Sequence, residues 1–391
     1  MIFVGIDVAK DKHVCFISGS DGKALFGSFS ITNNMDGFTN LYENISSVAD
    51  DMSKVKVGLE ATGHYSYNIL GYILGKGITT YLVDPLQTSL FRKYQNRRKT
   101  KTDRIDAQSI ANLLMTDSSL EPYSIASYHN EELKSLTRYR FSKVNERAKL
   151  KTSISRLVNI LFPELENLVS TLHIKSVYAL LSEFPGASYV ASAHMTHLTH
   201  ILHTTSKCYY GKDKATEIRD AARRSIGSIM PAKSLELRHT INLVNILSDE
   251  IDEIEVKIRE IMNELDSPIL GIPGISYRMG AMILAEIGDF SRFSSPDRIL
   301  AYAGMSPSTY QSGQLISSHA RMEKRGSKYL RYALFNATTY VCRWDKTFAV
   351  YLAKKRAEGK HYYVAITHAA KKLVRLIYAL QTSGKQYKLA T

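Results

Sequence analysis

The stretch IFVGID, Ile2 to Asp7, is a short apolar run that ends in an aspartate. A second run of the same kind, VKVGLE, ends in Glu60. Runs of this length that are rich in β-branched residues predict buried β-strands. The two stretches therefore indicate a sheet in which two strands each end in a carboxylate.

The residues around these two runs complete an α/β pattern. Strands are expected over 12–18, 24–31 and 78–83, and helices over about 35–49 and 65–76. The Asp21-Gly22 pair predicts a hairpin turn. Three antiparallel strands, a helix, and then parallel strands wrapped with helices form the order expected of an RNase H-like sheet. That order puts Asp7 and Glu60 on adjacent central strands.

Two further acids, Asp103 and Asp106, open a predicted helix within KTDRIDA, residues 101–107. Their spacing of three puts them on one helical face, which can converge with strand-end acids on a single point. Oxygen-only ligands suit Mg²⁺ or Mn²⁺ better than zinc. We interpret the four acids as a two-metal site for phosphoryl transfer, because carboxylates at apolar strand ends are costly without cations. A helix N-cap role for Asp103 and a helix-dipole role for Asp106 are the alternatives.

The positive charge of the chain points to nucleic acid. Its 391 residues hold 51 Lys+Arg against 37 Asp+Glu, a net charge of +14. The basic residues gather in two runs, one before the predicted acidic helix and one near the C-terminus, which are typical of phosphate contacts or of a solvated surface. The predicted phosphate contacts are Arg97, Arg98, Lys99, Lys101, Arg104, Lys324, Arg325, Lys328 and Arg331.

Composition excludes several classes of protein. No apolar run reaches the roughly 18–20 residues that a membrane span needs, so we expect a cytoplasmic protein with no membrane partner. Cys15, Cys208 and Cys342 lie far apart and form no CxxC pair. Neither a disulfide framework nor a cysteine zinc site is therefore indicated.

The length favours several domains. We predict an α/β catalytic domain over 1–130, a long-helix region of coiled-coil character over 131–265 and a mainly helical domain over 266–391. Apolar residues spaced by threes and fours over 131–162 and 234–265 predict two long helices, which pair within the chain or across a dimer. Between them, His194, His197, His200 and His203 suggest a polar helical face, although adjacent pairs could share a metal. Residues 271–288 favour a helix-hairpin-helix-like motif that exposes backbone N–H groups to phosphate.

Several motifs match one family in combination. These are GIDVAK at 5–10, EATG at 60–63, KTDRIDA at 101–107, IPGI at 272–275, AEIGD at 285–289, AYAGM at 301–305, QSG at 311–313 and KRGSKYLR at 324–331. They resemble the DEDD transposases of bacterial insertion sequences, which are relatives of the Piv-type DNA invertases. The resemblance covers about 1–150 and 266–345. Met305 departs from it, because a leucine is more usual there.

The resemblance implies a RuvC-like domain followed by a domain with a nucleophilic serine. By position, Asp7, Glu60, Asp103 and Asp106 are the Mg²⁺-binding catalytic tetrad and Ser312 is the nucleophile that links covalently to DNA. The implied partners are donor and target DNA duplexes and a structured guide RNA encoded by the element. Synapsis of two duplexes suggests a homodimer or a homotetramer.

Two other functions compete with strand exchange. A RuvC-like structure-specific endonuclease would cut by hydrolysis, with no role for Ser312 as a nucleophile. A nucleic-acid-binding scaffold with a decayed site would need none of the acids. The sequence leaves open the DNA targets, the need for an RNA, the oligomeric state and the group that activates Ser312.

Overall fold

The computed structural model describes residues 1–60, 65–83, 85–95, 102–118, 120, 122–123, 125–306, 311–312, 315–316 and 322–388. At 86, 93, 95, 125–129, 311, 312, 315 and 316 it describes the backbone alone. The chain divides into two units, Met1–Tyr128 and His129–Thr391. The predicted domain boundaries after residues 130 and 265 stay predictions.

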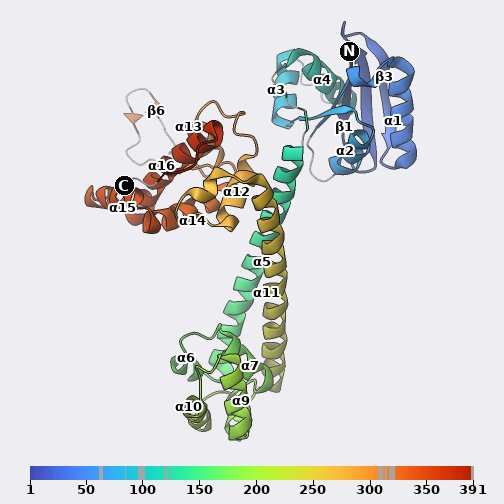
Figure 1. Cartoon of the computed structure of the whole chain (residues 1–391). Helices are drawn as coiled ribbons and strands as arrows, with labels where there is room; N and C mark the ends of the chain where they lie inside the picture. Colours follow the sequence, from blue (N-terminus) through green and yellow to red (C-terminus); the bar gives the residue numbers. More distant parts are fainter. Residues whose placement is uncertain are drawn as a thin grey trace. The chain divides into compact units, whose positions relative to one another are not determined.

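The first unit is built on a five-stranded mixed sheet (Figure 1). Its strands are β1 (Ile2–Asp7), β2 (Lys12–Gly19), β3 (Ala24–Thr32), β4 (Val55–Glu60) and β5 (Thr79–Val83), in the order β3-β2-β1-β4-β5. β1 and β2 pair antiparallel, as do β2 and β3, whereas β4 is parallel to both β1 and β5. The predicted mixed α/β arrangement, with the strands ending in Asp7 and Glu60 adjacent at its centre, is confirmed.

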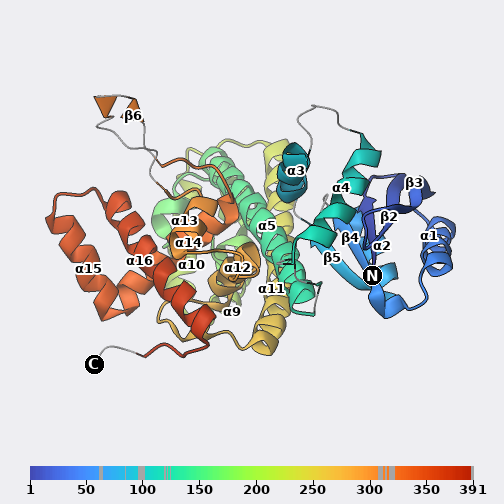
Figure 2. The ribbon, with the colours of Figure 1, turned by 90° about the horizontal axis from the view of Figure 1, so that it is seen from above.

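Helices cover both faces of this sheet (Figure 2). They are α1 (Met35–Val48), α2 (Ser66–Gly75), α3 (Pro85–Gln95) and α4 (Asp103–Thr116), with a 3₁₀ turn at Met52–Lys54. α1 and α2 pack on one face in a core with Val4 and Ile6. α4 packs on the other face, in clusters that include Phe3 and Val83. Because both faces of β1 are covered, its apolar run is continuous rather than alternating.

Two long helices, α5 (Ile125–Leu161) and α11 (Pro231–Leu265), lie side by side (Figure 1). Side-chain contacts join them as Arg140–Glu255, at 2.6 Å, and Lys143–Glu250, at 2.7 Å. From the first contact to the second, the residue number rises on α5 and falls on α11, so the two helices run antiparallel. They pair within the chain. The predicted seam of α11 is buried at residues Leu237, Ile241, Val244, Leu247, Ile251, Ile254, Ile258 and Ile261. The sequence had left the choice between pairing within the chain and across a dimer open.

Short helices surround one end of this pair. They are α6 (Leu165–Leu168), α7 (Lys175–Glu183), α8 (Ala187–Ser192), α9 (Met195–Thr205) and α10 (Lys212–Arg223), and they share an apolar core with α5 and α11. His194 is the residue before α9, and the His197 ring on α9 is hydrogen-bonded to the Glu183 carboxylate. In the part of the chain that the structure describes, no histidine belongs to a group of three or more metal-binding side chains. The polar-face interpretation of these histidines fits their positions.

Six further elements share a second core at the other end of the pair. They are a 3₁₀ turn at Pro268–Gly271, α12 (Tyr277–Ile287), α13 (Pro296–Tyr302), α14 (Lys328–Trp344), α15 (Lys346–Ala357) and α16 (Tyr362–Ser383). Two short strands, β6 (Gln311–Ser312) and β7 (Leu315–Ile316), lie between α13 and α14 in the sequence. A mostly helical remainder was predicted and is confirmed. None of the described helices is both long and apolar enough to span a membrane.

The segment predicted as helix-hairpin-helix-like is the 3₁₀ turn, a glycine turn and α12. Gly274 has a φ of +93°, and a Cβ there would lie 2.7 Å from backbone atoms of Tyr340 and Val341. Glycine is therefore required for the turn to pack against α14. The predicted phosphate contact of this motif stays a prediction.

Candidate active site

Asp7 and Glu60 occupy the same edge of the sheet. Ile6 is paired with Leu59 in the parallel β1–β4 ladder, so the next residue of each strand is one of the two acids. Both side chains are half-buried. Adjacent strands lie about 4.8 Å apart, which brings the two carboxylates to one edge of the sheet.

Helix α4 carries the other two acids to this edge. A Cβ on Gly5 would lie 2.0 Å from the Ala107 carbonyl oxygen, so only glycine lets α4 approach β1 this closely. At the far end of the helix, Met115 lies against Gly22 in the β2–β3 hairpin, beside the start of β1. α4 therefore runs antiparallel to β1, and its first turn lies at the Asp7 end.

The two acids of α4 have different environments. Thr102 caps the helix, its hydroxyl accepting from the Ile105 N–H at 3.3 Å, so Asp103 is the first helical residue and is exposed. Asp106 is only 4% exposed and forms an ion pair with Arg92 of α3. Thr102, and not Asp103, is thus the helix N-cap, so that alternative role of Asp103 is excluded, and the partner of Asp106 is a cation from the neighbouring helix.

All four acids lie in the described part of the chain, where no three Asp, Glu, His or Cys side chains form a group that could hold a metal. Oxygen donors from three neighbouring elements fit the chemistry of Mg²⁺ or Mn²⁺. The Arg92 guanidinium supplies positive charge to Asp106. A metal bound by Asp106 therefore competes with Arg92 for this carboxylate. The tetrad as a metal site stays a prediction.

His13 was missed by the sequence reasoning. Its side chain is fully buried on β2, stacked on Phe38, and its Nδ1 atom accepts a hydrogen bond from the Ala9 N–H at 3.2 Å. Burial lowers the pKa of His13, outweighing the nearby Asn33 side chain, which raises it, so the ring favours its neutral form. His13 thereby fixes the turn that follows Asp7.

The second predicted site is the segment around Ser312. The backbone of Ser312 belongs to β6, which pairs antiparallel with β7, and its side chain lies outside the described residues. Residues 302–306 and 323–327, which flank this segment, are hydrogen-bonded to each other. The Lys324 N–H donates to the Gly304 carbonyl at 3.1 Å, and the Ser327 N–H donates to the Tyr302 carbonyl at 2.9 Å. We call these two stretches the stem.

Two glycines permit the stem. Gly304 and Gly326 have φ of +65° and +109°. A Cβ at Gly304 would lie 2.2 Å from the Arg325 carbonyl oxygen, and one at Gly326 would lie 2.1 Å from that of Tyr302. Any larger residue would push the two stretches apart. The AYAGM and KRGSKYLR motifs therefore meet in space because each supplies one side of the stem.

A buried carboxylate anchors the stem to the helices. Glu286 of α12 is 1% exposed and accepts two hydrogen bonds from Arg138 of α5, at 2.6 and 3.0 Å. It also accepts from the Ser327 hydroxyl at 2.6 Å, while Ser327 caps α14. Burial alone raises the pKa of Glu286, but the hydrogen bonds from Arg138 and Ser327 outweigh it and the pKa is lowered. Sequence spacing gave no signal for this network.

The predicted phosphate contacts fall into three groups. Arg97, Arg98, Lys99 and Lys101 lie outside the described residues. Arg104, Lys324, Arg325 and Lys328 are exposed. Arg331 is half-buried, and its guanidinium donates to the carbonyls of Ala303, at 2.9 Å, and Lys324, at 3.3 Å. Arg331 thus holds the stem, and this structural role competes with its predicted contact to phosphate.

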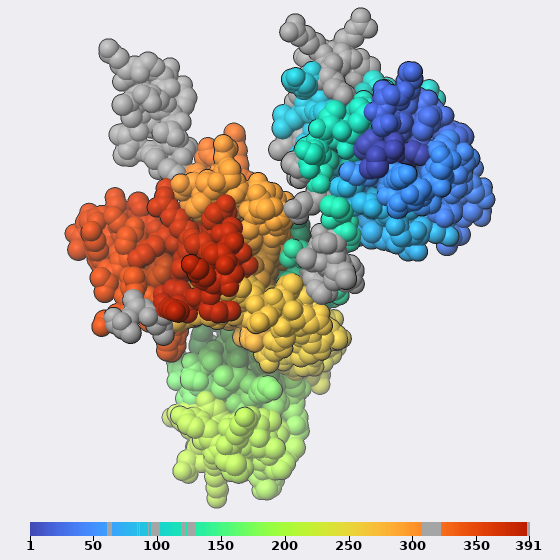
Figure 3. All heavy atoms as spheres, turned by 45° about the horizontal axis from the view of Figure 1, so that its top comes forward, coloured from blue at the N-terminus to red at the C-terminus, as the bar shows by residue number. Residues whose placement is uncertain are grey.

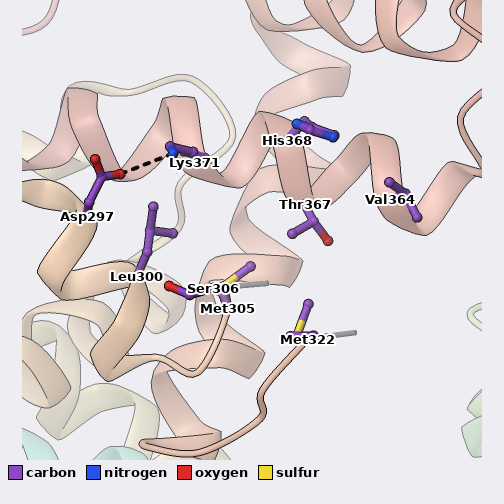
Figure 4. A pocket seen from close by; sticks show the side chains of 9 residues that line it. All are labelled: Asp297, Leu300, Met305, Ser306, Met322, Val364, Thr367, His368 and Lys371. Carbon is purple, nitrogen blue, oxygen red and sulfur yellow. Dashed lines mark ion pairs between the residues drawn. The ribbon is translucent and has the colours of Figure 1, made fainter. Parts of the chain in front are cut away.

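A cavity of about 490 Å³ lies beside the stem (Figure 4). Its lining is mainly apolar and includes Leu300, Met305 and Met322. An ion pair at 3.3 Å between Asp297 and Lys371 lies at its edge. Its lining also includes Ser306, Thr367 and His368, and none of its described lining residues is a predicted site residue.

Models of two transposase families match the chain. The DEDD transposase model of IS110 matches residues 4–163, and the model described as transposase IS116/IS110/IS902 family matches residues 266–353. These matches define the class of the protein as a transposase, an enzyme of DNA recombination. Within that class, the chain is a DEDD transposase of the IS110/IS116 family of insertion elements.

Individual relatives resemble the chain over its full length. The "insertion element IS900 uncharacterized 42 kDa protein" of Mycobacterium paratuberculosis is 24% identical over 100% of this chain and 98% of its own. The "pilin gene-inverting protein" of Moraxella bovis is 25% identical over 98% of this chain and 97% of its own. The Thermus thermophilus RuvC structure covers 32% of this chain and 100% of its own, at 12% identity and a TM-score of 0.24. A likeness that low supports no conclusion.

Proposed function

We propose that this transposase cuts and rejoins DNA through a covalent link to Ser312, assisted by Mg²⁺ bound to Asp7, Glu60, Asp103 and Asp106. The observation that supports the proposal best is the meeting of β1, β4 and the first turn of α4 at one sheet edge. Each of these three elements, which are distant in sequence, brings at least one acid there. A basic chain has little other reason to gather carboxylates at one edge.

The acids would hold the metal, and bound Mg²⁺ would stabilise charge on the phosphate in the transition state. The Ser312 hydroxyl attacks a DNA phosphorus and forms a serine–phosphate ester. The bond from phosphorus to the sugar oxygen breaks, and the serine proton is passed on as that oxygen becomes a hydroxyl. Attack by a hydroxyl end of the partner strand then restores a phosphodiester and frees Ser312.

The proposal includes the nucleic acids. Donor and target duplexes are its DNA substrates, and a structured RNA encoded by the element guides their pairing. The exposed cations Arg104, Lys324, Arg325 and Lys328 are proposed phosphate contacts. Two duplexes held together favour a homodimer or a homotetramer.

The test is strand exchange with purified protein, Mg²⁺, the RNA transcribed from the element end, and two labelled duplexes. We expect recombinant joints that require Mg²⁺ and are lost in Asp7→Asn and Glu60→Gln, while both variants still bind DNA. Omission of the RNA separates its role from that of the protein. Products with free, unjoined ends alone would instead favour the hydrolytic endonuclease.

A further inference from the structure

Helix α14 carries exposed aromatic side chains on one of its sides. Tyr340 is 49% exposed and Trp344 is 68% exposed. Residues four apart are neighbours on a helix surface, so these two side chains lie on one side of α14. About two helical turns before Tyr340, Tyr332 is 38% exposed, and its ring packs edge-on against the ring of Phe141. Several large aromatic side chains exposed to solvent on one helix are typical of a binding surface.

The charge around the aromatic pair is positive. Arg343 and Lys346 lie within two residues of Trp344 in the sequence and are exposed, and the Arg343 guanidinium lies 6.0 Å from the centre of the Tyr340 ring. The nearest acid in sequence, Asp345, is 2% exposed and accepts from the Phe348 N–H and the Tyr387 hydroxyl. The negative charge of Asp345 is therefore buried, so the exposed charges next to Trp344 in the sequence are positive.

The same bias extends over the neighbouring helices. α14, α15 and α16 contain no aspartate or glutamate within their bounds, although they carry basic residues throughout. They pack together in one core, seen in orange-red to red in Figure 3. Exposed aromatic rings surrounded by charges of one sign, the positive one, complement the base faces and phosphates of a nucleic acid.

We propose that Tyr340 and Trp344, with Arg343 and Lys346, form a stacking site for single-stranded nucleic acid. An aromatic ring binds the face of an unpaired base, and that face is covered in a duplex. The flanking cations contact the phosphates on either side of the stacked base. This inference rests on the proposed function, in which strands are opened and exchanged.

Trp344 is the single tryptophan of the chain, so its fluorescence reports on this site alone. We expect a single-stranded oligonucleotide to quench its emission on binding, and a duplex of the same sequence to quench it much less. Trp344→Ala should weaken single-strand binding about 5- to 100-fold, and Trp344→Phe should retain most of it. Lys346→Gln should weaken binding and lower its salt dependence by about one phosphate.

Tyr209→Ala provides the matched control, because Tyr209 is an 82% exposed tyrosine far from α14 in the sequence and its loss should not affect binding. The inference is wrong if anisotropy detects single-strand binding while Trp344 emission stays constant, or if Trp344→Ala binds like the parent. In either case the proposed function stands. If the parent protein binds neither strands nor duplexes, the proposed function fails with it.

Discussion

Arg138 Nε lies 2.6 Å from Glu286 Oε1, and this pair joins residues 148 positions apart in the chain. The Glu286 side chain is inaccessible to water, whereas that of Arg138 is 41% exposed. Through Ser327, the same carboxylate reaches the stem that flanks Ser312. The pair therefore connects α5, α12 and α14 at the base of the proposed nucleophile segment.

We predict that Glu286→Gln lowers the free energy of unfolding by about 3 kcal/mol. Removal of one partner of a buried pair costs about 3–5 kcal/mol, and the lower end applies because Arg138 reaches water. Urea unfolding measures the change. The exposed pair Lys257–Glu260 is the control, and Glu260→Gln should leave the stability almost unchanged. Equal effects of the two variants would show that the Glu286 network does not hold the fold.

The same carboxylate predicts a dependence of stability on pH. The folded-state pKa of Glu286 is lowered below its ordinary value of 4.5. Its contribution to stability is therefore complete above about pH 4.5 and is lost as the pH falls through the folded-state pKa. Unfolding free energies measured between pH 3 and 6 should fall more steeply for the parent than for Glu286→Gln. Parallel curves would contradict this assignment.

Gly326→Ala tests the stem. A Cβ at Gly326 would lie 2.1 Å from the Tyr302 carbonyl oxygen, on a residue with φ of +109°. We expect a loss of about 2–4 kcal/mol from strain and overpacking together, and a loss of strand exchange. Gly359→Ala is the matched control, since Gly359 has φ of +76° in open space and carries only the backbone strain of about 1–2 kcal/mol. A smaller effect at Gly326 than at Gly359 would refute the steric account.

Arg92→Met tests the competition at Asp106. Without Arg92, the buried Asp106 carboxylate lacks its cation, so the variant should unfold at a lower temperature in the absence of metal. Mg²⁺ should then bind about tenfold more tightly and restore the unfolding temperature. Arg104→Met, which removes an exposed arginine of α4, is the control. An unchanged Mg²⁺ affinity in Arg92→Met would mean that Asp106 does not take part in metal binding.

Local patterns predicted the elements but not their long-range partners. The strand ends at Asp7 and Glu60 follow from apolar runs that any buried strand shows. The burial of the α11 seam follows from spacing by threes and fours. The pairing of α11 with α5 depends on contacts between residues far apart in the chain, such as Arg140 and Glu255, which are 115 positions apart, and the sequence left it open.

The candidate site likewise combines residues that local sequence patterns predict with residues that only folding brings together. The two strand-end acids were predicted because each is local to one strand. Arg92, His13 and the Glu286 network were not, since each acts through a partner brought close only by folding. Arg331 was predicted to bind phosphate, and the structure adds a role in holding the stem carbonyls.

The central claim is that strand exchange passes through a covalent Ser312–DNA link. The most direct measurement incubates the protein with end-labelled element DNA and Mg²⁺, denatures the mixture, and separates protein-linked label by electrophoresis. The account predicts a protease-sensitive adduct for the parent and for Ser306→Ala, a neighbouring serine, and none for Ser312→Ala. An adduct that persists in Ser312→Ala, or strand exchange by that variant with no adduct, would contradict it.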